Sequence, residues 1–119
     1  MQIQLKRAYA KPSKSDGRRI LVDRLWPRGV GRERLQLDDW AKDIAPSPTL
    51  PKWFGHDPEK WKDFKQRYFE ELDSRSDAVG KLLADGDSRR ITLIFGARDE
   101  RHNHAVALKE YLLKHARRF

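Results

Sequence analysis

Two polar stretches of the sequence carry the side chains best suited to binding or to chemistry. VDRLWPRG spans residues 22–29, and FGARDERHNH spans residues 95–104. Each follows a short apolar run that is typical of a strand buried on both faces. In open parallel sheets, ligands bind where the strands end, because loops and helix N-termini converge at that edge. If the two strands are neighbours, we expect the two loops to meet and to form one crevice.

The residue types in these loops favour an anionic, phosphate- or nucleotide-like ligand. Guanidinium groups present planar, forked N–H donors that match phosphate or carboxylate oxygens. The residues expected to bind the ligand are Arg24, Trp26, Arg28, Trp53, Arg98 and Asn103. Under the structural alternative, the arginines pair with Asp23, Asp99 and Glu100 and only tie the loops together. Asn103 has its own alternative, which is to cap backbone groups.

Three residues are candidates for proton transfer if the protein is an enzyme. They are His56, Asp99 and His104. An imidazole titrates near neutral pH, which suits a general acid or base. No serine stands beside a base, so the sequence nominates no nucleophile. Whether the protein is an enzyme stays open, and each candidate has an ordinary structural or surface role as its alternative.

The sequence predicts neither a metal site nor a cofactor. It contains no cysteine, which excludes thiolate ligands and disulfides. His102 and His104 are two positions apart, so on a helix their side chains differ in direction by about 200° and do not share a face. The P-loop, GxGxxG, HExxH and GxSxG motifs are absent as well.

The elements that position these loops predict a single compact α/β domain over residues 1–119. Residues 2–6 alternate between polar and apolar, as in a strand at the edge of a sheet. Residues 20–22 and 91–95 are continuous apolar runs, and the segment between them has helical character. Such a crossover favours parallel pairing. We therefore expect a short, mainly parallel sheet of three or four strands covered by helices.

Three helices are predicted from apolar residues that recur every three or four positions. They begin at Asp57, Ser76 and Asp99, each a candidate N-cap, and the second should end near Gly86. The first helix carries an aromatic stripe that we expect to pack in the core, namely Trp61, Phe64, Tyr68 and Leu72. Residues 35–54 fit either a helix or a short extra strand.

The charge balance favours anionic partners. The chain has 26 Lys and Arg against 18 Asp and Glu, which gives a formal net charge of +8. A basic nucleic-acid-binding module is the alternative to a small anionic ligand, and a protein-interaction subunit that uses the aromatic stripe is the second alternative. No apolar run approaches the roughly 20 residues that cross a bilayer. The first residues also lack the apolar core of a secretory signal, so we expect a cytoplasmic protein without a membrane partner. The oligomeric state does not follow from the sequence.

Three segments resemble the YeaO-like family of small bacterial proteins, which contain domain of unknown function 488. They are LVDRLWPRG, DDWAKDIAPSPTLPKWFGHDPEKWKDFKQRYFEEL and TLIFGARDERHNHAVALKEYL. The resemblance extends over nearly the whole chain. It implies a compact single α/β domain in a bacterial cytosol and names no substrate. Larger relatives carry a Cys-His-Arg signature after the last strand, where this sequence has residues 101–104, RHNH, so the resemblance implies no thiol chemistry.

Overall fold

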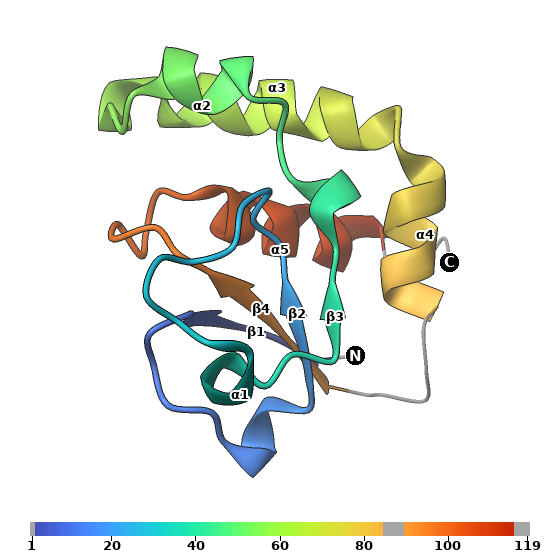
Figure 1. Cartoon of the computed structure of the whole chain (residues 1–119). Helices are drawn as coiled ribbons and strands as arrows, with labels where there is room; N and C mark the ends of the chain where they lie inside the picture. Colours follow the sequence, from blue (N-terminus) through green and yellow to red (C-terminus); the bar gives the residue numbers. More distant parts are fainter. Residues whose placement is uncertain (1, 85–89, 116–119) are drawn as a thin grey trace.

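The computed structural model describes residues 2–84 and 90–115, and within these ranges four strands form one parallel sheet (Figure 1). The strands are β1 (Gln2–Arg7), β2 (Arg18–Leu21), β3 (Asp39–Trp40) and β4 (Arg90–Phe95). Their order across the sheet is β1-β4-β2-β3. The predicted α/β class, the parallel pairing and the edge position of the first strand are all confirmed. The open segment 35–54 contributes a short strand as well as helices.

The two apolar runs form adjacent central strands of this sheet. Leu21 of β2 lies opposite Ile94 of β4 in a parallel register. The backbone N–H of Val22 extends the pairing by donating to the Ile94 carbonyl at 3.0 Å. Because parallel neighbours end at the same edge, the loops that follow β2 and β4 leave the sheet side by side.

The helical segments follow the predicted order with one correction. They are α1 (Arg32–Leu35), α2 (Thr49–Phe54), α3 (Trp61–Asp73), α4 (Ser76–Ala84) and α5 (His104–His115), with 3₁₀ turns η1 (Lys14–Asp16), η2 (Lys42–Ile44) and η3 (Pro58–Lys60). Asp57 is an N-cap, since its side chain accepts from the Glu59 N–H and η3 leads directly into α3. The prediction of Asp99 as the cap of the last helix is wrong, because α5 begins five residues later at His104. The predicted stop at Gly86 lies outside the described residues.

The helices and the long loop cover opposite faces of the sheet. Figure 1 shows α5 against one face, while the loop that contains α1 crosses the other. On the α5 face the core includes Ile20, Ile91 and Leu93. The aromatic stripe of α3 also packs there, with Phe64, Tyr68 and Leu72 buried and Trp61 packed against the cluster. The stripe is therefore mainly core, as expected, with Trp61 half-buried at its N-terminal end.

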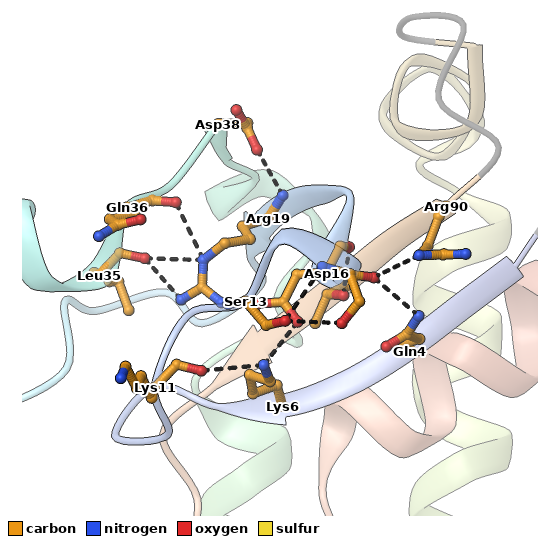
Figure 2. Close-up of polar contacts among 12 residues, drawn as sticks. Gln4, Lys6, Lys11, Ser13, Asp16, Arg19, Leu35, Gln36, Asp38 and Arg90 are labelled. Atoms are coloured by element: carbon orange, nitrogen blue, oxygen red, sulfur yellow. Dashed lines mark hydrogen bonds and ion pairs between the residues drawn. The ribbon is translucent and has the colours of Figure 1, made fainter.

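A buried charge network fixes the other face (Figure 2). Asp16 is 1% exposed and accepts from Lys6 Nζ at 2.7 Å and from Arg19 Nη1 at 2.6 Å. Arg19, itself 4% exposed, also donates through Nη2 to the Leu35 carbonyl at 2.7 Å at the end of α1. Thr92 of β4 donates its hydroxyl to the Asp16 carbonyl at 2.6 Å. This network attaches the turn before β2 and the end of α1 to the sheet.

A search of the described helices for a long apolar span found none that could cross a membrane.

Candidate functional site

The loops that follow β2 and β4 meet at Asp23. Its Oδ2 atom accepts a hydrogen bond from the backbone N–H of Gly96 at 2.9 Å. Nε2 of His104, the first residue of α5, lies 3.1 Å from the Val22 carbonyl and 2.9 Å from Asp23 Oδ1. Asp23 Oδ1 is buried and has no hydrogen-bond partner in the described chain, so we treat the approach of His104 to this atom as electrostatic. Because a carbonyl only accepts, Nε2 carries the proton in the hydrogen bond to Val22.

Further hydrogen bonds connect the ends of all four strands. Trp40 of β3 donates its indole N–H to the Asp23 carbonyl at 2.7 Å. Arg7, the last residue of β1, donates through Nε to the Ala97 carbonyl at 2.9 Å and through Nη2 to the Gly96 carbonyl at 3.3 Å. Hydrogen bonds thus connect the C-terminal edge of the sheet, and Asp23, which follows β2, contacts residues at the ends of β3 and β4.

From the sequence, Asp23 was expected only as a partner for the loop arginines, and Arg7 was not among the expected site residues. A signal for Asp23 is present in the sequence, because a carboxylate directly after a buried strand lies within reach of the backbone where the neighbouring strand ends. For Arg7 the sequence offers no comparable signal, since a basic residue at the end of an edge strand is common on protein surfaces.

The three loop arginines differ in their contacts. Arg24 donates to the Pro46 carbonyl at 3.1 Å and the Ala45 carbonyl at 3.5 Å, so it ties the loop to the segment before α2. Arg28 and Arg98 are exposed. No ion pair joins any of the three to Asp23, Asp99 or Glu100 in residues 2–84 and 90–115. Two guanidinium groups, on the two connected loops, are therefore open to solvent.

Trp26 and Trp53 lie in different surroundings. Trp26 is half-buried, donates its indole N–H to the Val30 carbonyl at 2.5 Å and packs edge-on against Trp40 with ring centroids 5.4 Å apart. The ring of Trp53 instead contacts two cations: Arg67 Cζ lies 4.2 Å and Lys60 Nζ 5.2 Å from the ring centroid. It lines a groove between α2 and α3 that the two loops do not reach.

Asn103 is buried and caps α5. Its Oδ1 atom accepts from the Val106 N–H at 3.0 Å, and its Nδ2 donates to the Asp99 carbonyl at 2.8 Å. Both ends of the amide are thereby used within the protein, which matches the capping alternative for this residue.

The three candidates for proton transfer lie apart. Asp99 accepts from the backbone N–H groups of Arg101 at 2.9 Å and His102 at 3.0 Å, and these bonds hold the pKa of its carboxyl below its ordinary value. His56 is exposed and has a left-handed backbone with φ 57. No contact joins His56, Asp99 and His104 to one another in the part of the chain that the structure describes. Within the same residues, no group of three or more His, Asp or Glu side chains is placed to hold a metal ion.

Comparison with known proteins relates the chain to bacterial proteins of similar length. A family model described as the inactive DUF488-N3 subclade, DUF488-N3i, matches residues 2–118. Uncharacterized protein YeaO of Escherichia coli (strain K12) is 42% identical over 113 residues, which cover 94% of this chain and 97% of YeaO. Uncharacterized protein Rv3073c of Mycobacterium tuberculosis (strain ATCC 25618 / H37Rv) is 34% identical over 111 residues, or 93% of each chain. No solved structure matches the chain significantly.

Proposed function

Because the chain belongs to the inactive DUF488-N3 subclade, we propose that it binds an anionic ligand without transforming it. The ligand carries a phosphate group, as a nucleotide does. It binds at the C-terminal edge of the sheet, where Arg28 and Arg98 hold the phosphate oxygens.

The proposal rests on the position of these two arginines on connected loops, on their exposure and on their lack of ion pairs. They lie on different loops, yet the hydrogen bond from Gly96 to Asp23 fixes the loops relative to one another. Both side chains are exposed and form no ion pair in the described residues. Unpaired guanidinium groups suit phosphate, because their forked donors match its oxygens and no existing ion pair has to be broken on binding. The net charge of +8 adds attraction for anions at longer range.

The contacts of Asp99 and His104, two of the three candidate catalytic groups, also support binding rather than catalysis. Asp99 already accepts two backbone N–H bonds and contacts the ring of His102 at 3.2 Å. Nε2 of His104 is engaged with Val22 and Asp23. A general acid or base has to reach the reacting atoms of its substrate, and these groups are directed at the protein itself.

The test compares two double variants that remove the same charge. Arg28→Gln with Arg98→Gln removes the proposed site, whereas Lys52→Gln with Lys62→Gln removes two exposed cations from α2 and α3. Calorimetric titration with pyrophosphate is expected to show an affinity at least tenfold lower for the arginine pair, since a hydrogen bond to a charged group contributes about 1.5–3 kcal/mol. The lysine pair should bind like the wild type. Equal losses of pyrophosphate affinity in both double variants would show that only net charge matters and would contradict a specific site. Absence of pyrophosphate binding by the wild type would refute the proposal.

A second candidate function, nucleic-acid binding, is favoured by one observation. Leu25 is 78% exposed on the loop between Arg24 and Trp26. Proteins that bind nucleic acids insert such apolar side chains between bases while arginines contact the phosphates.

The matched control for this candidate is Leu113, which is 50% exposed on α5. If the protein binds nucleic acid through the loop, Leu25→Ser weakens its binding to a labelled single-stranded oligonucleotide and Leu113→Ser does not. Binding should also fall steeply with salt in fluorescence anisotropy. Lack of binding at low salt excludes this candidate.

A further inference from the structure

We infer that a hollow beside the proposed phosphate site binds the base of a guanine nucleotide. The inference rests on the proposed function, because it supplies the base-binding part of the same ligand site. The hollow, called here the Trp26–Trp40 hollow, has a volume of about 280 Å³ and is lined by Trp26, Arg32, Leu37, Asp38, Asp39 and Trp40. It lies along β3, the edge strand whose outer side no other strand covers in the described residues.

Aromatic side chains form the walls of the hollow and are held in place before any ligand binds. The rings of Trp26 and Trp40 meet at 71°, with centroids 5.4 Å apart. Each indole N–H is fixed by a backbone carbonyl, that of Val30 for Trp26 and that of Asp23 for Trp40. Both rings are only half-buried, and Leu37 adds apolar surface between them and the backbone. Flat, fixed aromatic walls suit a planar heterocycle, because stacking then costs little side-chain entropy.

A cationic ligand suits the hollow less well than a neutral base. Aromatic walls with nearby carboxylates also bind ammonium groups. Here, however, Arg32 already supplies a cation at the hollow beside Asp38 and Asp39, and the Trp40 ring already has Lys42 Nζ at 4.0 Å from its centre.

The polar groups of the hollow select among the bases. Asp38 uses Oδ2 to accept from the backbone N–H of Arg19 at 2.8 Å, while its Oδ1 has no hydrogen-bond donor in the described chain. Asp39 accepts from the Trp40 N–H at 2.8 Å through Oδ1. An ionised carboxylate accepts hydrogen bonds and donates none, so the base has to supply the donors. Guanine presents N1–H and the exocyclic amino group side by side on one edge, whereas adenine has an acceptor at N1, so guanine is the base that pairs best with Asp38.

The position of Arg32 connects the base to the phosphate. Arg32 lines the hollow and is exposed, and Arg28 lies two residues after Trp26 on the same loop. A nucleotide whose base stacks on Trp26 therefore directs its phosphate toward cations already assigned to phosphate binding.

The four tryptophans provide the readout. Their indole N–H signals in a ¹⁵N-labelled sample are assigned by single Trp→Phe variants, and the folded wild-type protein is titrated with guanosine, which lacks phosphate. We expect saturable shifts of the Trp26 and Trp40 signals, while the signals of Trp53 and Trp61 stay in place as internal controls. Adenosine and uridine should bind at least tenfold more weakly, since each lacks one of the paired donors.

A matched pair of variants tests the carboxylate. Asp38→Asn is expected to raise the dissociation constant for guanosine about tenfold, which is the order for losing a hydrogen bond to a charged group. Asp43→Asn removes the same charge from an exposed position outside the hollow and should leave binding unchanged. Equal binding of guanosine and adenosine would overturn the assignment of guanine.

The outcomes separate this inference from the proposed function. If pyrophosphate binds through Arg28 and Arg98 but guanosine leaves the Trp26 and Trp40 signals unmoved, the base site is refuted and the proposed function stands. If guanosine moves these signals while pyrophosphate does not bind, the proposed function fails and the hollow is a base site on its own.

Discussion

The carboxylate of Asp23 accepts the backbone N–H of Gly96 at 2.9 Å, so the second residue after β2 is bonded to the first residue after β4. A Cβ atom added at Gly96 would lie 3.1 Å from the same Asp23 oxygen, which shows how closely the two loops approach. A carboxylate of the protein thus takes a backbone donor that a bound anion would otherwise use. The exposed guanidinium groups of Arg28, Arg98 and Arg101 lie on the same two loops.

Asp23→Ala should lower the free energy of unfolding by about 2 kcal/mol, because it leaves the partly buried Gly96 N–H without its acceptor. The measurement is urea denaturation followed by circular dichroism. Glu100→Ala is the matched control, since this carboxylate is exposed on the neighbouring loop, and its effect should stay within about 0.5 kcal/mol. Similar losses in the two variants would show that Asp23 does not hold the loops together.

Alanine substitutions at three glycines should separate backbone strain from steric clash. Gly31 has φ −79 and open space around it, so alanine should change stability by less than about 0.5 kcal/mol. Gly29 also has open space but φ +73, and alanine there should cost about 1 kcal/mol. Gly17 has φ +65, and a Cβ added there would lie only 2.3 Å from the Arg90 carbonyl oxygen. Gly17→Ala should therefore lower the free energy of unfolding by more than about 2 kcal/mol. Thermal or urea unfolding that ranks Gly29→Ala below Gly17→Ala in stability would contradict this order.

Protonation of the Asp16 carboxylate should lower the free energy of unfolding in acid. Burial alone would raise the pKa of this carboxyl, but hydrogen bonds from Lys6, Ser13 and Arg19 outweigh burial and lower it below its ordinary value of 3.8. A group whose pKa is lower in the folded state contributes stability above its unfolded pKa and loses that contribution as the pH falls through the folded pKa. The stability difference between wild type and Asp16→Asn should therefore be full at neutral pH and shrink as the pH falls below 3.8. Urea titrations across this range check the trend, and a difference independent of pH would refute it.

Variants of Asn103 distinguish the helix cap from a ligand contact. Asn103→Ala should lower stability by about 1 kcal/mol, the usual cost of losing an N-cap. Asn103→Asp keeps an oxygen for the Val106 N–H and should recover most of this loss. The affinity of the folded variants for pyrophosphate should match the wild type. A drop in affinity without a drop in stability would instead make Asn103 a ligand-binding residue.

The sequence by itself determined the elements whose signals are local. The apolar runs at 20–22 and 91–95 predicted buried strands, and the helical segment between them favoured the parallel pairing that the structure has. Asp57 was identifiable as a cap and the α3 stripe as core, because both depend on residues at most a few turns apart. Even the meeting of the two loops followed from these elements, since neighbouring parallel strands end at one edge.

Only the tertiary structure decided how the polar groups at that edge are used. Asp23 and Gly96 are 73 positions apart, and their bond exists because β2 and β4 pair in one particular register. Asp99 and Asn103 were both plausible caps, and the choice depended on where the packing of α5 let the helix begin. Hydrogen-bond partners distant in sequence are set by packing, and local periodicity contains no information about them. For this reason the sequence could nominate Arg28 and Arg98, whereas only the structure showed that their side chains, like that of Arg101, are exposed and form no ion pair within the described residues.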